Sequence, residues 1–66
     1  MFAKRLKELR TEVGLSQNQL AKRLNVSKQN ISDWENGKSE TSFELLIKIA
    51  EVFEVTVGQL IGSESL

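Results

Sequence analysis

The stretch 17–36, QNQLAKRLNVSKQNISDWEN, limits what this chain can fold into more than any other. It holds two short runs in which apolar side chains recur at helical spacing, Leu20, Ala21 and Leu24 in the first and Ile31 and Trp34 in the second. Asn25 lies between the runs, and asparagine tolerates the left-handed backbone conformation of a sharp helix exit. Ser27 can then cap a new helix. The stretch predicts two helices joined by a tight turn.

The small residue Ala21 decides how closely these two helices can approach. A bulky side chain at this position would push the helices apart. A small residue in the first helix, a turn residue that accepts the left-handed conformation and an apolar face on each helix are together what a helix-turn-helix requires. We therefore expect a helix-turn-helix at 17–36.

The rest of the chain predicts three more helices, because apolar residues recur at helical spacing and no alternating apolar run predicts a strand. The first helix is expected from about Phe2 to Val13, with Leu6, Leu9 and Val13 on its inner face. The fourth, 43–53, is apolar almost all round and is expected to be a surrounded central helix, with Leu45, Leu46, Ile49, Ala50 and Phe53 buried. A short fifth helix at 57–61 is expected to close the bundle through Leu60 and Ile61. The end of the chain, 63–66, is expected to fray.

Helix-entry signals support this all-α prediction. Ser16 with Gln19, and Thr56 with Gln59, have the spacing of capping boxes, in which each side chain bonds the other residue's backbone N–H. Thr41 or Ser42 is expected to cap the fourth helix, and Thr41 is the preferred candidate because Glu44 completes a capping box with it. Entry signals that agree with the helical spacing are a mark of a consistent fold.

Composition narrows the function classes. The 66 residues are enough for one domain, expected to span 1–66, and they include no Cys and no His. Disulfides, thiolate nucleophiles and imidazole–metal sites are thereby excluded. Nothing in the sequence supplies an acid–base pair or a phosphate-binding glycine loop, so we expect neither an enzyme nor a cofactor. No signal peptide and no membrane span is expected, which makes a soluble cytoplasmic protein the default.

Charge is distributed unevenly although the net charge is zero. The segment 1–38 carries eight basic and four acidic side chains, a net +4, and 39–66 carries one basic and five acidic side chains, a net −4. One half of the chain can therefore face phosphates while the other stays away from them. Ordinary scatter of surface charge is the alternative, and the asymmetry alone favours a DNA partner only slightly.

The outer face of the second helix in the motif carries side chains suited to reading bases. On a helical wheel with Ile31 and Trp34 inward, the opposite side holds Gln29, Ser32, Asp33 and Asn36, and Lys28 projects from the helix start. A Gln amide can bind adenine, a Lys can donate to guanine, and an Asp can accept from cytosine. Gln29 is the best candidate base reader, followed by Lys28 and Asp33, with Ser32 a smaller candidate. Asn30, on the flank, could reach the groove wall or the DNA backbone.

The whole pattern resembles the helix-turn-helix of the phage-repressor and Cro family, which includes small bacterial regulators of the xenobiotic-response-element type. The resemblance covers nearly the whole chain and rests on Gly14-Leu15-Ser16-Gln17, Leu20-Ala21, Val26-Ser27, Ile31-Ser32, Trp34-Glu35-Asn36-Gly37-Lys38, Leu45-Leu46 and Ile49-Ala50. It implies a five-helix bundle of the lambda-repressor-like DNA-binding type with the helix-turn-helix in its second and third helices. It also implies a transcriptional regulator, expected to be a repressor, that binds an inverted-repeat operator as a homodimer with its recognition helix, about 28–36, in the major groove.

The resemblance also assigns roles to individual residues. It gives Gln17 a contact with a phosphate and a flanking base, and it places the turn Asn36-Gly37-Lys38 on the DNA backbone. It pairs Arg10 with Glu35, a carboxylate that the wheel places on the inward flank of its helix. Dimer contacts are expected around Val57, Gly58 and Gln59, and near Phe43.

Four residues depart from the family pattern, and one rival function is open. Glu40 puts an acid in a connector that often carries a basic group near DNA. Asn25 and Glu54 stand where the family often has Gly, and Thr41 stands where it often has Pro, so strain is expected at the exit beside Glu54. Trp34 could stack on bases, but its spacing from Ile31 favours the core.

The rival function is a protein-interaction module, such as an antitoxin that uses the same fold mainly to hold a partner protein.

Overall fold

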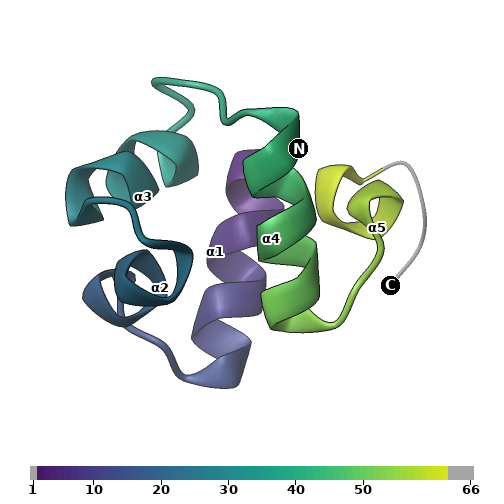
Figure 1. Ribbon diagram of the computed structural model, residues 1–66, viewed down its shortest axis with the longest axis horizontal. Helices are drawn as coiled ribbons and strands as arrows, with labels where there is room; N and C mark the ends of the chain where they lie inside the picture. The colour runs from purple at the N-terminus through teal and green to yellow at the C-terminus, as the bar shows by residue number, and fades with distance from the viewer. Residues whose placement is uncertain (1, 63–66) are drawn as a thin grey trace.

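Five helices and no strand form in the part of the chain that the computed structural model describes, residues 2–62. The helices are α1 (Phe2–Val13), α2 (Gln17–Leu24), α3 (Lys28–Glu35), α4 (Phe43–Phe53) and α5 (Val57–Ile61). Figure 1 shows α2 and α3 on one side of the pair formed by α1 and α4, with α5 on the other side. The expected all-α five-helix architecture is confirmed. The expectation that 63–66 fray lies outside the described residues.

Polar side chains fix where the helices begin. Ser16 and Thr56 both form complete capping boxes with the Gln three residues later, and Ser27 Oγ accepts from the backbone N–H of Asn30 at 3.1 Å. These three entry signals were correctly predicted. Such caps satisfy N–H groups that have no partner within their own helix.

The preference for Thr41 as the cap of α4 was wrong. Ser42 is the cap, and its Oγ accepts from the backbone N–H of Leu45 at 3.2 Å. The chain enters α4 one residue later than a Thr41–Glu44 box would require. Thr41 Oγ1 is instead buried and has no hydrogen-bond partner.

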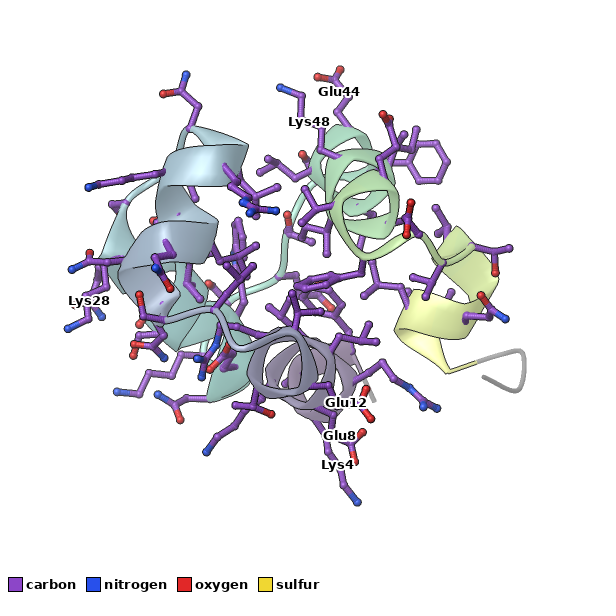
Figure 2. The ribbon with its side chains drawn as sticks, turned by 90° about the horizontal axis from the view of Figure 1, so that it is seen from below. Lys4, Glu8, Glu12, Lys28, Glu44 and Lys48 are labelled. Carbon is purple, nitrogen blue, oxygen red and sulfur yellow. The ribbon has the colours of Figure 1, made fainter. Side chains whose placement is uncertain are left out.

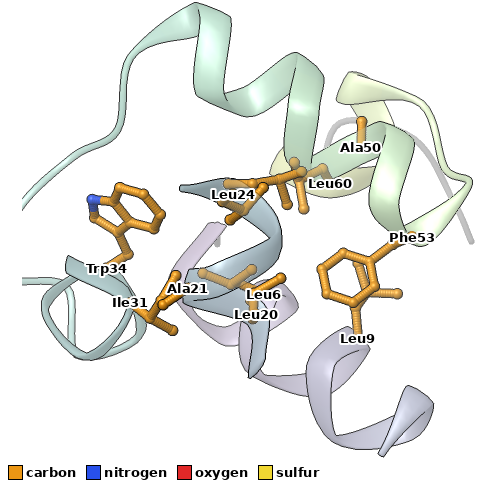
Figure 3. Close-up of a cluster of buried hydrophobic side chains, with 11 residues drawn as sticks. Leu6, Leu9, Leu20, Ala21, Leu24, Ile31, Trp34, Ala50, Phe53 and Leu60 are labelled. Carbon is orange, nitrogen blue, oxygen red and sulfur yellow. The ribbon is translucent and has the colours of Figure 1, made fainter. Parts of the chain in front are cut away.

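The core lies where α1 meets the other helices. α1 packs against α3, α4 and α5, while α2 packs against α3 and α4. Figure 3 shows buried side chains from all five helices in one cluster: Leu6, Leu9, Leu20, Ala21, Leu24, Ile31, Trp34, Ile49, Ala50, Phe53 and Leu60. This cluster holds the helix-turn-helix against the rest of the bundle, so the position of α3 depends on α1.

α4 and the ends of two other helices are more exposed than the sequence predicted, although the partial exposure expected of Phe43 is confirmed. α4 contacts α1, α2 and α5, and on the face that these helices leave open Phe43 is 68% exposed and Ile47 39% exposed. The expectation of a surrounded α4 was therefore wrong. Three predicted core residues, Leu45, Leu46 and Ile61, are only partly buried or exposed, and Val13 is exposed because it lies at the end of α1, where the chain reverses at Gly14.

Two residues that are not glycine adopt the left-handed conformation at helix exits. Asn25 ends α2 with a φ of 58°, and Glu54 ends α4 with a φ of 56°. Asparagine tolerates this region because its short polar side chain can bond locally, whereas glutamate has no such advantage. The strain expected at Glu54 is therefore present in the backbone.

We predict that Glu54→Gly stabilises the protein, because glycine adopts a positive φ without steric cost. The expected gain is about 1 kcal/mol, or a rise of about 4–8 °C in Tm for a domain of this size. Thermal unfolding followed by circular dichroism measures it. Glu51→Gly is the matched control, since it removes the same charge from the same end of α4 but puts glycine inside the helix, where it costs about 1 kcal/mol. An unchanged or lower Tm for Glu54→Gly would contradict the prediction.

Candidate nucleic-acid interface

The turn between α2 and α3 sets the orientation of α3. The left-handed conformation of Asn25 lets its own N–H bond Lys22 O at 3.3 Å and lets the N–H of Val26 bond Ala21 O at 3.0 Å. Ala21 is 3% exposed where the two helices meet. The small side chain and the tight turn hold α2 and α3 together as one rigid pair.

The outer face of α3 presents the predicted base readers. Ile31 and Trp34 are buried, Lys28 and Gln29 are exposed, and Ser32 and Asp33 are partly exposed. Figure 2 shows Lys28 pointing away from the body of the bundle. A row of polar side chains on one exposed helix face, backed by a fixed core, is suited to hydrogen bonding with base edges in a groove.

Two hydrogen bonds that were not predicted from the sequence run along this face. Gln29 Nε2 donates to Asp33 Oδ1 at 2.9 Å, and Asn36 Nδ2 donates to Ser32 Oγ at 3.3 Å. Both pairs are four residues apart, which is the spacing at which polar side chains meet on a helix. This four-residue spacing is the sequence signal from which both bonds could have been predicted. Three of the predicted base readers therefore have partners on their own helix.

A nearly buried ion pair ties α1 to the end of α3. Arg10 Nε donates to Glu35 Oε2 at 2.6 Å, and Arg10 Nη2 donates to Glu35 Oε1 at 3.1 Å. The two side chains are 11% and 3% exposed. A third donor of the same guanidinium, Nη1, reaches Leu15 O at 2.8 Å. Arg10 and Glu35, which the resemblance paired, thus form a bidentate ion pair.

Gln17 joins this ion pair from the first turn of α2. Its Nε2 donates to Glu35 Oε1 at 3.1 Å, and the residue is partly buried. The start of α2 and the end of α3 are therefore linked through one carboxylate. This link orients the residue to which the resemblance gives a phosphate contact, and it was not expected from the sequence.

The turn after α3 uses its own backbone N–H groups to end the helix. The N–H of Asn36 bonds Ser32 O at 3.0 Å, that of Gly37 bonds Trp34 O at 3.2 Å, and that of Lys38 bonds Asp33 O at 2.8 Å. Gly37 supplies the positive φ, 71°, that the turn needs. Contacts from this turn to a phosphate would therefore come from the exposed side chains of Asn36 and Lys38.

The residues expected at a dimer contact lie elsewhere on the molecule. Phe43, at the start of α4, is the most exposed large apolar side chain of the described residues, while Val57, Gly58 and Gln59 are partly buried in the first turn of α5. Gln59 Oε1 accepts from the N–H of Thr56 at 2.9 Å, so its side chain already caps α5. These residues form no part of the outer face of α3.

Two searches of the described residues bear on other kinds of site. Within residues 2–62, no helix is both long and apolar enough to cross a membrane. The same residues contain no cluster of three or more side chains that could hold a metal ion. The candidate functional site is the outer face of α3.

The fold and this face define the chain as a helix-turn-helix domain of the lambda-repressor-like type. Its sequence matches the helix-turn-helix family model over residues 6–60, which includes all of α2, α3 and α4. The chain belongs to this family, the phage-repressor and Cro type of helix-turn-helix proteins. The family recognised from the sequence is thereby confirmed.

Similar proteins include transcription regulators from several bacteria. The HTH-type transcriptional activator BcrR of Enterococcus faecalis is 43% identical over 98% of this chain, which spans 32% of that protein. A transcriptional regulator from Listeria innocua superposes with a TM-score of 0.91 at 30% identity, covering 100% of this chain and 62% of that one. The restriction-modification controller protein C.AhdI from Aeromonas hydrophila has a TM-score of 0.83 at 32% identity, with 89% of each chain covered.

Two further similarities bear on other functions. Antitoxin PezA of Streptococcus pneumoniae is 32% identical over 100% of this chain, which spans 42% of that protein. Hydroxypropylphosphonic acid epoxidase from S. wedmorenis has a TM-score of 0.82 at 33% identity, with 89% of this chain matching 31% of that enzyme. The chain thus spans less than two thirds of several of its relatives, and the same fold occurs within proteins of different activity.

Proposed function

We propose that this protein is a transcription regulator that binds double-stranded DNA in a sequence-specific manner. The observation that carries the proposal is the outer face of α3, where Lys28, Gln29, Ser32 and Asp33 are presented by a helix that is fixed on its inner side. A helix of this size enters the major groove, where each base pair offers a distinct pattern of donors and acceptors. The proposal assigns no catalytic activity to the chain.

Separate residues supply the contacts that fix the domain on the duplex. Gln17 is held at the start of α2 by Glu35, Asn30 lies exposed on the flank of α3, and Asn36 and Lys38 are exposed just after it. These four side chains can donate to phosphate oxygens on either side of the groove that α3 enters. Phosphate contacts set register and orientation, while the contacts from α3 to base edges set the sequence.

We further propose that two copies bind an inverted repeat. Half-sites one helical turn apart, about 34 Å, would each receive one α3 in a two-fold complex. Phe43 supports a contact between copies because it is 68% exposed, an unusual state for a large aromatic side chain. Val57, Gly58 and Gln59, at the start of α5, complete the proposed contact.

The direction of regulation follows from where the operator lies. A bound domain represses when its site overlaps the site of the polymerase, and we propose repression as the function of this chain. The relative BcrR carries the name of an activator. A reporter gene tests whether this chain represses or activates, with the selected operator placed either overlapping the promoter or upstream of it. Repression requires the overlapping position.

The first test is selection from random duplex DNA with the purified protein, followed by sequencing of the bound pool. We expect an enriched inverted repeat, and we expect Gln29→Ala to relax one position in each half-site with a loss of about 5- to 150-fold in affinity for the best site. Lys28→Ala should weaken binding, whereas Lys48→Ala, on α4, is the matched control and should not. Absence of enrichment at low salt would overturn the proposal.

One observation favours a second function, that of a protein-interaction module. An antitoxin is among the relatives, and Phe43 and Ile47 leave part of α4 apolar and exposed. Native mass measurement of the protein purified from its own cells distinguishes the two functions. A stable complex with an unrelated small protein, together with no enriched DNA, would favour this alternative, and a homodimer with an enriched repeat would exclude it as the main function.

A further inference from the structure

We propose that Asp33 is a positioning residue that fixes the amide of Gln29, so that the pair reads adenine and rejects guanine; this inference rests on the proposed DNA-binding function. Lys28, Gln29 and Asp33 were each expected to read a base on their own. The structure joins two of them: Gln29 Nε2 lies 2.9 Å from Asp33 Oδ1 on the exposed face of α3. The unit that faces the groove is therefore a pair.

The chemistry of the two groups allows only one orientation of the amide. An ionised carboxylate accepts hydrogen bonds and donates none, while an amide carries an acceptor oxygen on one side and a donor NH2 on the other. Rotating the Gln29 amide by half a turn would place Oε1 against Oδ1, two acceptors facing each other. Asp33 thus selects the orientation in which NH2 faces the carboxylate.

The fixed amide presents a defined pattern to a base. One of its two N–H groups is given to Asp33, which leaves Oε1 as an acceptor and the second N–H as a donor on the remaining edge. Adenine offers an N6–H donor and the N7 acceptor in the major groove, which match that edge. Guanine offers two acceptors, O6 and N7, and Oε1 would meet one of them without a proton between.

Without the carboxylate, the amide could turn to offer its NH2 to guanine O6. The loss of Asp33 should therefore change which base is preferred more than it changes how tightly the preferred site is bound. A role of Asp33 in stabilising α3 would lower affinity for every sequence alike. The ratio of affinities for two duplexes that differ at one base pair separates these roles.

The test measures binding of four proteins to the selected operator and to its variant with guanine in place of the adenine read by Gln29. We expect the wild-type chain to prefer adenine by about ten- to hundredfold. Asp33→Asn keeps the shape but lets either amide orientation find a partner, and it should reduce the preference to about threefold or less. Asp33→Glu keeps an acceptor carboxylate four residues from Gln29, so this variant should retain most of the preference for adenine. Gln29→Ala identifies the position that is read.

A second measurement requires no DNA. In the free protein, the Gln29 side-chain amide should have a 15N order parameter above that of a flexible group, about 0.6, and Asp33→Asn should lower it. A mobile Gln29 amide in the wild-type chain would overturn the inference. So would an unchanged adenine preference in Asp33→Asn while Gln29→Ala still relaxes that position, and the proposed DNA binding would then stand. No enriched DNA with the wild-type chain would overturn both.

Discussion

Replacing Arg10 by Met should destabilise the fold by about 3–5 kcal/mol, because it leaves the Glu35 carboxylate nearly buried without its partner. Arg10 gives Glu35 two hydrogen bonds and gives Leu15 O a third. Gln17 would remain as the single donor to Glu35. Since a domain of this size has a total stability of about 3–10 kcal/mol, Arg10→Met should lose a large part of it.

Urea unfolding of a double-mutant cycle measures this effect. Glu35→Leu combined with Arg10→Met should cost clearly less than Arg10→Met alone, because the double variant leaves no charge stranded in the core. Lys7→Met, an exposed change on the same helix, is the control and should stay within about 0.5 kcal/mol of the wild type. Equal stability of the wild type and Arg10→Met would show that the pair contributes nothing.

Trp34→Ala should have an effect of similar size, about 3–5 kcal/mol, because Trp34 is 4% exposed and packs in the core cluster. Figure 3 shows Trp34 on α3, the helix that also carries Ile31, among the side chains of this cluster. Removal of this ring would leave a cavity between α3 and the rest of the core. We expect the loss of helical circular dichroism at 37 °C, with DNA binding lost as a consequence.

Fluorescence of Trp34 decides between a core and a base-stacking role for this residue. Because this is the chain's one tryptophan, its fluorescence reports on this site alone. A core residue should show blue-shifted emission that DNA leaves nearly unchanged, whereas stacking on a base would quench it. A Trp34→Ala protein that stays folded yet fails to bind DNA would contradict the core assignment.

The helices and their starting points could be predicted because the signals for them are local. Helical spacing, Ser and Thr caps and residues that accept a positive φ each act within a few residues, and the bounds of α2 and α3 followed from them. Thr41 shows the limit of this reasoning: two adjacent residues could each cap α4, and only the path of the connector selects Ser42.

Burial on α4 could not be predicted from the same signals. An apolar pattern shows which residues could be covered, but it does not show which side of a helix has neighbours. Phe43 and Ile47 share a helix with the buried Ile49 and Phe53, yet they lie on the face that α1, α2 and α5 leave open. Because α4 is apolar almost all round, the sequence predicted that other helices surround it. In the structure, Phe43 and Ile47 are exposed instead.

The candidate site was predicted as a set of residues but not as a set of bonds. The wheel placed the polar residues of α3 opposite Ile31, which needs only helix geometry. The partners of Gln17, Gln29 and Asn36 depend on side-chain conformation as well as spacing. The pair of Gln29 and Asp33 was within reach, because Gln and Asp four residues apart on a helix commonly bond.

The packing of α1 against α3, α4 and α5 sets the order of events when the protein is made. Of the five helices α1 is made first, and its buried face, with Leu6 and Leu9, is covered in stages by α3, α4 and finally α5. At about 5–20 residues per second, α5 follows α1 by several seconds. The packing of α1 is thus complete only after the last of the five helices has been synthesised.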